Sequence, residues 1–367
     1  MKKSRQKQNR RGIIIGGAFG MDNLGDEAIL EAMLSELRGI TDEPITVVTT
    51  APEKTAGRFG VEVVAKFGIG GFIRAAKHAR LFISGGGSLI QDATSSRSLW
   101  YYLFLIAAAK LCGARVLMGG CGIGPVTGRL NRYLTRVVVN RCVEKITLRD
   151  RISISELDNL RVSRPEVLLA ADFVFSENAD FLGAGESETR DFALFILRSW
   201  GGIKEKVETL ADCAAYMHRK YGLTPCFLPL NPKDFEIAAE VSAVLDEKYP
   251  GVPYTNMQTV KTPGEVFDAI KNARVCLSVR LHGLIMAAAA GIPVVGISYD
   301  PKVAGFMDYA ELPTWLPLGE MSETRLEEII DRALSDEFGE RLREARNRLQ
   351  NAEKVNSEAI KALILEA

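Results

Sequence analysis

Short apolar segments rich in β-branched residues alternate along the chain with longer amphipathic segments. This alternation is typical of βαβ units, in which each helix connects two parallel strands of one sheet. In the first half of the chain the pattern predicts strands at 12–15, 45–50, 61–64, 81–84, 115–118 and 145–148. It predicts helices between them at 26–38, 69–78, 98–112 and 128–141.

A second series of the same kind follows a polar, glycine-containing interruption at 176–190, which we interpret as a linker. Strands are predicted at 192–197, 225–230, 253–256, 274–279 and 293–297, and helices at 206–221, 235–249, 263–272 and 281–290. The sequence therefore predicts an α/β protein of two Rossmann-like domains, 12–175 and 191–320, with a ligand cleft between them. Residues 321–367 have a helical period and are expected to return to the first domain.

The composition is that of an ordinary globular chain, with 367 residues of which 47% are hydrophobic and 25% charged. Residues 1–11 carry six basic side chains and no acid, so the net charge of zero conceals an acidic body. A nucleic-acid binder would spread positive charge over a folded face, which excludes that class. The leader is either a solvated segment or a weak attachment to anionic lipid at the membrane surface.

No apolar segment reaches the roughly 18 residues that a membrane-spanning helix needs. The first one, 12–16, is too short for the core of a signal peptide. The six cysteines are scattered and include no Cys-x-x-Cys pair, a pattern that favours reduced thiols over a disulfide framework or a zinc site. We therefore expect a cytoplasmic protein without a bound metal.

A glycine-rich loop follows the first predicted strand and ends in Asp26 and Glu27. Its glycine spacing is not that of a dinucleotide fingerprint, and two acids at a helix start would repel a pyrophosphate. The two carboxylates either bind or deprotonate sugar hydroxyls, or they cap the helix and complement its dipole. On the first interpretation the substrate-binding residues of this loop include Gly20, Asp22 and Asn23, and the catalytic group that activates a hydroxyl is Asp26 or a neighbouring acid such as Asp22.

Three consecutive glycines follow another predicted strand, in the segment 84–92. Glycine lets a ligand or a neighbouring loop approach the backbone closely, and a structural turn rarely needs three in a row. A third glycine-rich loop, at 119–125, repeats the pattern, so we expect an extended ligand across this domain. The predicted binding residues of the second loop are Gly85, Gly86, Gly87, Gln91 and Asp92.

Cations end several predicted strands of the acidic body, at Arg149, Arg198, Arg280 and Lys302. Four such positions favour one strongly anionic substrate. His282 follows the same strand as Arg280, which favours an acid at an anion site over a capping or packing role. The other two histidines, at 78 and 218, lie on predicted solvated helix positions.

Five motifs occur in one order along the chain: GMDNLGDEA at 20–28, SGGGS at 84–88, QD at 91–92, RLHG at 280–283 and YDPKV at 299–303. Together they resemble the polysaccharide pyruvyl transferase family, over about residues 13–302. The chain is most similar to the bacterial branch that attaches pyruvate to N-acetylmannosamine of a secondary cell-wall polymer, which serves in anchoring S-layer proteins.

The resemblance implies a fold like that of the B-type glycosyltransferases, phosphoenolpyruvate as the donor without any further cofactor, and a lipid-linked saccharide as the acceptor. It implies functional roles for Arg149, Arg280, His282 and Lys302, which match the family motifs. Two positions depart from the pattern: residues 18–19 are Ala-Phe where Tyr-Tyr is common, and Phe173 follows Asp172 where proline is usual. The first departure removes a phenol from the predicted acceptor loop.

The residue chemistry fits this donor as well, because its phosphate and carboxylate need two or more cationic partners. His282 is placed to protonate the methylene carbon of the donor, while the acidic loop of the N-terminal domain serves the acceptor. Two alternatives remain: a nucleotide-sugar glycosyltransferase of the same architecture, and a non-catalytic saccharide-binding protein. Sugar binding alone gives no reason for clustered cations beside a histidine.

Overall fold

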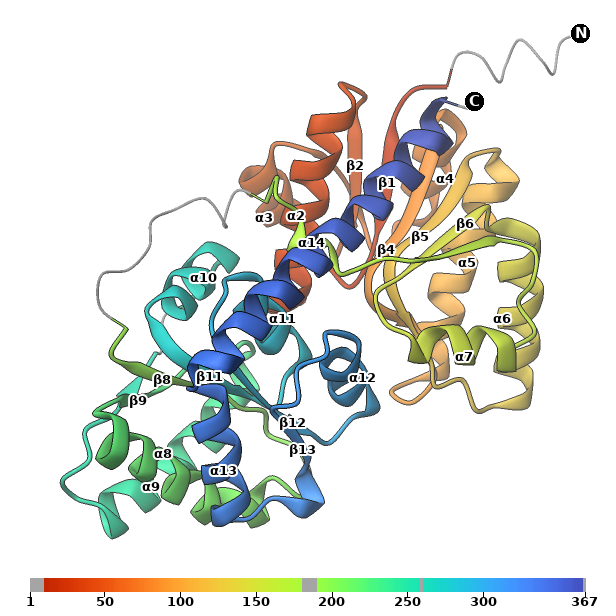
Figure 1. Ribbon diagram of the computed structural model, residues 1–367. Helices are drawn as coiled ribbons and strands as arrows, with labels where there is room; N and C mark the ends of the chain where they lie inside the picture. Colours follow the sequence, from red (N-terminus) through yellow and green to blue (C-terminus); the bar gives the residue numbers. More distant parts are fainter. Residues whose placement is uncertain (1–9, 180–189, 258–259, 366–367) are drawn as a thin grey trace, which may run out of the picture. The chain divides into compact units, whose positions relative to one another are not determined.

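The computed structural model describes residues 10–179, 190–257 and 260–365. The chain divides into two compact units, each built on one parallel sheet (Figure 1). Of the described residues, unit 1 comprises 10–21, 29–179 and 350–365, and unit 2 comprises 22–28, 190–257 and 260–349. The predicted linker lies largely on 180–189, outside the described residues.

Unit 1 contains a seven-stranded sheet in the order β3-β2-β1-β4-β5-β6-β7. Near-continuous apolar runs such as Ile13–Ile15, no more than 1% exposed, form its central strands, because helices cover both faces of a parallel sheet. The strand order reverses between β1 and β4, and ligands of open α/β sheets bind at the carboxyl ends beside such a reversal. The strands are β1 (Ile13–Gly16), β2 (Ile45–Thr49), β3 (Glu62–Ala65), β4 (Leu81–Ile90), β5 (Arg115–Ile123), β6 (Lys145–Leu148) and β7 (Glu166–Leu169).

The helices of unit 1 follow from apolar periodicity and from local capping. In the helix Ser96–Cys112, Leu99, Leu103 and Ile106 recur at helical spacing, and Ser95 caps its start by accepting a hydrogen bond from the Arg97 backbone N–H. The helices are α2 (Leu24–Ile40), α3 (Pro52–Phe59), α4 (Ile69–His78), α5 (Ser96–Cys112), α6 (Arg129–Cys142) and α7 (Ile152–Asn159).

Strands β4 and β5 are longer than the sequence predicts, and this corrects two predicted loops. The glycines at 85–87 and 119–120 lie within the strands, where Gly85 pairs with Gly119 and Gly87 with Cys121. Gly86 has a φ of +71°, and a Cβ there would lie 2.2 Å from Ile29 of α2. Glycine is therefore required for packing at Gly85 and Gly86, where Met33 and Ile29 of helix α2 lie against the backbone, and at Gly120, where Phe173 does.

Unit 2 contains a six-stranded parallel sheet in the order β10-β9-β8-β11-β12-β13, which reverses between β8 and β11 (Figure 1). Helix α12 and strand β13 were not predicted from the sequence. The strands are β8 (Phe192–Ile196), β9 (Thr224–Phe227), β10 (Thr255–Asn256), β11 (Ala273–Ser278), β12 (Val294–Ser298) and β13 (Trp315–Pro317). The helices are α8 (Val207–Tyr221), α9 (Phe235–Lys248), α10 (Pro263–Lys271), α11 (Leu281–Ala289) and α12 (Pro301–Tyr309).

The C-terminal segment forms two helices, α13 (Glu323–Ala333) and α14 (Asp336–Leu365), where the sequence predicts one continuous helical stretch. Residues 336–349 of α14 belong to unit 2, and its remainder belongs to unit 1. None of the helices within the described part of the chain is both long and apolar enough to span a bilayer.

The unit 1 half of α14 buries polar side chains against helix α2. Glu36, which is 5% exposed, accepts hydrogen bonds from Ser176 Oγ at 2.6 Å, from Asn178 Nδ2 at 2.9 Å and from Ser357 Oγ. Burial alone raises the pKa of Glu36, but these hydrogen bonds outweigh it and hold the pKa below its usual value of 4.5. Glu353 is 2% exposed, and burial followed by repulsion from Glu36 raises its pKa to about 8.

Replacing Glu353 by glutamine is expected to flatten the pH dependence of stability. In the wild type the folded state keeps a proton on Glu353 that the unfolded state loses above about pH 4.5, so stability falls as the pH rises toward 8. The slope is at most roughly 1.4 kcal/mol per pH unit. Melting temperatures between pH 5 and 8 measure it, and Glu358→Gln on the exposed face of the same helix is the control. Equal slopes for wild type and Glu353→Gln would contradict this account.

Candidate functional site

Three neighbouring strands of unit 2 each run into a cation at the carboxyl edge of the sheet. Arg198 follows β8, Arg280 follows β11 and Lys302 follows β12, and these strands are adjacent in the sheet. Strand order reverses between β8 and β11. The structure thus gathers three of the four predicted cations at the position where an open α/β sheet binds its ligand.

Arg280 is held in place from two sides. Its backbone N–H donates to Ser278 Oγ at 3.0 Å, and that hydroxyl lies 2.8 Å from the Arg280 carbonyl. Its guanidinium forms an ion pair with Asp234, with 2.6 Å between Nη2 and Oδ2. Asp234 is only 2% exposed, so the pair holds the guanidinium in a fixed orientation, and its contact with a donor anion stays a prediction.

His282 lies in the first turn of α11 and packs against Gly25 of the acidic loop. A Cβ on Gly25 would lie 2.4 Å from His282 Nδ1 and 2.6 Å from its Cβ, so this contact requires glycine. Residues 22–28 belong to unit 2, where the Leu24 N–H donates to the Leu230 carbonyl at 3.3 Å. Because Gly25 directly precedes Asp26, His282 contacts the chain immediately before that carboxylate.

Asp26 and Glu27 lie in the first turn of α2, where carboxylates complement the helix dipole. Asn23 Nδ2 lies 2.5 Å from Asp26 Oδ2, and the Glu27 N–H donates to the Asn23 carbonyl at 3.1 Å. Asp22 is exposed, with a φ of +52°. Asp26 is half-buried, so it serves the helix start and still reaches solvent beside the His282 contact.

Arg198 lies against two aromatic rings that also pack on each other. Its Nη1 donates to Tyr299 Oη at 2.5 Å, and its guanidinium carbon lies 5.1 Å from the centroid of the Trp200 ring. Burial raises the pKa of Tyr299, although the charges of Arg198 and Arg280 act in the opposite direction. The surroundings of Tyr299 thus favour its neutral phenol form.

Lys302 is the second residue of α12 and is half-buried. Asp300 caps this helix, accepting a hydrogen bond from the Lys302 N–H at 3.0 Å. The N-termini of α11 and α12 thus follow adjacent strands, and the amide dipoles of a helix start favour an anion. Both helix starts and the cations make this edge of unit 2 suited to a ligand with more than one negative charge.

In unit 1, Arg149 follows β6 and is 5% exposed. Its Nη1 lies 2.5 Å from Asp172 Oδ2, and its Nη2 donates to Ser88 Oγ at 3.4 Å. Asp172 is 2% exposed and also accepts from the Val174 N–H at 3.1 Å. Contact of Arg149 with a donor anion stays a prediction, since the described partners of this guanidinium are protein groups.

The polar side chains of the second predicted loop form hydrogen bonds to other groups of unit 1. Asp92 accepts hydrogen bonds from the backbone of Thr127 and Gly128 and from Asn131 Nδ2, the last at 2.8 Å. Burial raises the pKa of Asp92, but these bonds outweigh it and lower the pKa from its usual value. Gln91 bonds Thr94. Asp92 thus holds the start of α6 and Gln91 holds the turn before α5, and a ligand role for both residues stays a prediction.

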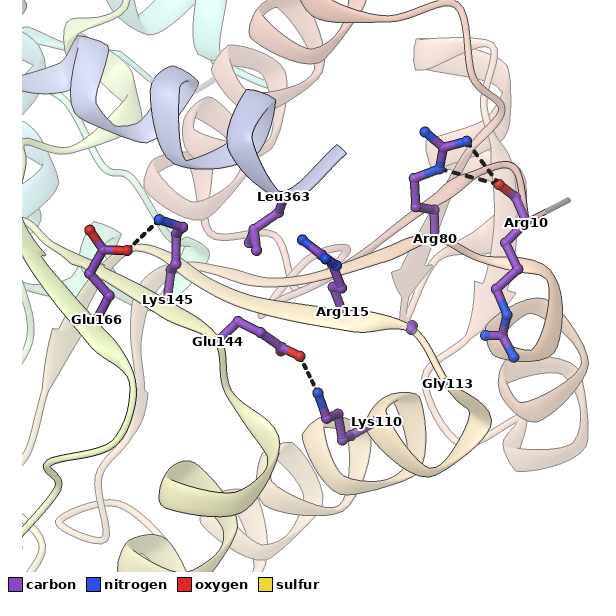
Figure 2. Close-up of a pocket in the computed structure, with 10 residues that line it drawn as sticks. Arg10, Arg80, Lys110, Gly113, Arg115, Glu144, Lys145, Glu166 and Leu363 are labelled. Atoms are coloured by element: carbon purple, nitrogen blue, oxygen red, sulfur yellow. Dashed lines mark hydrogen bonds and ion pairs between the residues drawn. The ribbon is translucent and has the colours of Figure 1, made fainter. Parts of the chain in front are cut away.

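A pocket of about 610 Å³ lies at the opposite edge of the unit 1 sheet, where strands β5 and β6 begin (Figure 2). Lys110 pairs with Glu144 and Lys145 with Glu166, while Arg10 Nη2 donates to the Cys112 carbonyl at 2.6 Å. The charged side chains that line the pocket thus largely pair with other protein groups, and none of the predicted site residues lines it. Its lining consists of Arg10, Arg80, Lys110, Gly113, Ala114, Arg115, Glu144, Lys145, Glu166 and Leu363.

Sequence reasoning did not select Asp234, Trp200 or Tyr299. An aspartate after a loop proline carries no signal of its own. Tyr299 begins the YDPKV motif, and Trp200 follows Arg198 by two residues at a predicted strand end, so both carried a signal that could have been used. Within the described residues, no group of three histidine, cysteine, aspartate or glutamate side chains is arranged to hold a metal ion.

The family model described as polysaccharide pyruvyl transferase matches residues 23–301 of the chain. No curated protein matches the sequence. Among solved structures, a glycosyltransferase from Rickettsia africae is 10% identical, with a TM-score of 0.64 over 98% of this chain and 100% of that chain. A UDP-GlcNAc 2-epimerase from Methanocaldococcus jannaschii is 11% identical, with a TM-score of 0.63 over 89% of this chain and 92% of that chain. These likenesses confirm the predicted fold, that of the B-type glycosyltransferases and related epimerases.

Proposed function

The chain belongs to the polysaccharide pyruvyl transferase family, and from that premise we propose that it transfers pyruvate from phosphoenolpyruvate to a saccharide as a ketal. The proposed acceptor is N-acetylmannosamine of a lipid-linked cell-wall polymer precursor, met at the cytoplasmic face of the membrane. The observation that carries the proposal is the row of Arg198, Arg280 and Lys302 on three adjacent strands, with His282 against the acidic loop.

The donor fits this edge by charge. Phosphoenolpyruvate carries a phosphate and a carboxylate on neighbouring atoms, so it needs cations that converge from more than one strand. Arg280, fixed by Asp234, offers a planar fork, and Lys302 offers a point charge at the start of the helix that follows the next strand. The N-termini of α11 and α12 add backbone dipoles of the same sign.

In the proposed reaction His282 gives a proton to the methylene carbon, which becomes a methyl group and leaves an oxocarbenium-like centre at C2. One acceptor hydroxyl forms a C–O bond to C2 and loses its proton to a base, for which Asp26 is our candidate. The C2–O bond to phosphate then breaks, and a second hydroxyl closes the ketal. Of the two hydroxyl protons released, one replaces the proton given by His282 and the other leaves with phosphate.

The direct experiment incubates the protein with phosphoenolpyruvate and a synthetic lipid-linked disaccharide that ends in N-acetylmannosamine. We expect phosphate release that requires both substrates, and a product heavier than the acceptor by one pyruvate ketal. A thermal-shift assay separates the alternative: phosphoenolpyruvate should raise the melting temperature and UDP should not. Stabilisation by UDP alone, with no phosphate released, would contradict the proposal and favour a nucleotide-sugar transferase.

Replacing Gly25 by alanine is expected to lower turnover by roughly 10²-fold, because a misplaced catalytic group costs about that much. The added Cβ would lie 2.5 Å from Cγ and 2.6 Å from Cβ of His282, so the whole imidazole must move. Gly39→Ala is the matched control, since it lies on the same helix with nothing within 4 Å of the added Cβ. Equal activity of both variants in the phosphate-release assay would show that the Gly25 contact does not position His282.

A further inference from the structure

A large aromatic side chain stands exposed beside the cationic edge of unit 2. Trp200 lies in the irregular segment that follows β8, and 51% of its surface is exposed to solvent. Exposure of an indole leaves apolar area in water, and within a site it is typical of a contact residue. Neither the family motifs nor the proposed proton transfers use Trp200.

The Trp200 ring is held in place by its neighbours. It packs on Tyr299 with 5.5 Å between ring centroids and 37° between ring planes. Arg198 lies against both rings, 5.1 Å from the Trp200 centroid and 5.7 Å from the Tyr299 centroid. Because Arg198 also donates to Tyr299 Oη at 2.5 Å, the three side chains form one rigid aromatic platform, defined here as Arg198, Trp200 and Tyr299.

The platform is tied to the Arg280 turn through the backbone. Ser199 Oγ donates to the Lys233 carbonyl at 3.0 Å, and Lys233 directly precedes Asp234, the ion-pair partner of Arg280. Lys302 follows Tyr299 by three residues. The exposed ring therefore adjoins the cations that would hold the donor, and an ordered ring binds with little further loss of side-chain entropy.

We propose that the aromatic platform stacks against the pyranose ring of the acceptor, with Trp200 as the contact residue. This inference rests on the proposed function, because ketal formation requires two sugar hydroxyls to come within about 3–3.5 Å of C2 of the donor. The acceptor ring must then lie next to the donor cations, where Trp200 offers its exposed face. The acidic segment 22–28 belongs to the same unit, so unit 2 carries groups for both substrates.

Tryptophan fluorescence tests the platform without relying on catalysis. The chain has three tryptophans, at 100, 200 and 315, and the probe is the methyl glycoside of N-acetylmannosamine. We expect a saturable change of emission that is lost in Trp200→Ala and kept in Trp315→Phe. Trp315 is the matched control, because it lies in unit 2 on the edge strand β13, where its indole donates to Asp308. A response to UDP but not to the glycoside would overturn the proposal in favour of a nucleobase platform.

Kinetics give the second test. Trp200→Ala is expected to raise the KM for the acceptor about tenfold while the KM for phosphoenolpyruvate changes less than twofold, and Trp200→Phe should recover most of the loss. An unchanged acceptor KM in Trp200→Ala would also overturn the proposal. The failure of the proposed function is distinguishable: glycoside binding at Trp200 without any phosphate release would refute pyruvyl transfer and leave the sugar platform standing.

Discussion

Replacing His282 by glutamine is expected to lower turnover by about 10²–10⁴-fold while phosphoenolpyruvate still binds. Glutamine keeps a polar side chain of similar length in the first turn of α11, but it has no proton to give to the methylene carbon. Steady-state phosphate release measures the loss of turnover, and calorimetric titration with phosphoenolpyruvate measures the retained binding.

His78→Gln is the control for this variant, since His78 is exposed at the end of α4 and should tolerate the change with full activity. The comparison also assigns the role of His282. If His282→Gln loses donor affinity and turnover to the same degree, the imidazole binds the donor and the general acid lies elsewhere.

Replacing Arg280 by alanine is expected to reduce kcat/KM by roughly 30- to 1000-fold. This corresponds to a loss of about 2–4 kcal/mol of transition-state stabilisation. The structure adds a second consequence. Asp234 is 2% exposed, and removal of its partner leaves a buried carboxylate uncompensated, so the variant should also lose stability. Activity is therefore measured well below the melting temperature of the variant.

Two further variants separate the effects on catalysis and on folding. Arg280→Lys keeps a charge near Asp234 but lacks the planar fork, so it should retain more stability than activity. Arg274→Ala removes an exposed cation at the opposite end of the same strand β11 and should change neither. Near-normal turnover in Arg280→Ala would exclude Arg280 as the main donor ligand.

The alternation of apolar and amphipathic segments predicted the fold class, because burial of parallel strands on both faces leaves a direct trace in hydrophobicity. Prediction of strands from hydrophobicity failed where the apolar pattern is weak. Strands β4 and β5 continue through their glycines, since neighbouring strands and helix α2 stabilise backbone that has low strand propensity by itself. Strand β13 has three residues and lies at a sheet edge, so it carries no periodic pattern.

In the candidate site, too, some residues could be predicted from the sequence and others could not. His282 and the cations at 198, 280 and 302 could be selected from the sequence, because each lies at or shortly after the end of a predicted strand. Their partners could not be selected. Asp234 lies 46 positions before Arg280 in the chain, and the glycine that fits His282 lies in the first turn of α2, in the first half of the chain.

By itself, therefore, the sequence determined the parallel α/β architecture, the family and the residue types at the strand ends, since these depend on local periodicity and on short motifs. Only the tertiary structure decided which strands are neighbours, and so which cations share one edge. It also decided that the acidic segment 22–28 groups with unit 2 and that Trp200 packs on Tyr299. These contacts join residues far apart in the chain, and their energies depend on distances that no local pattern encodes.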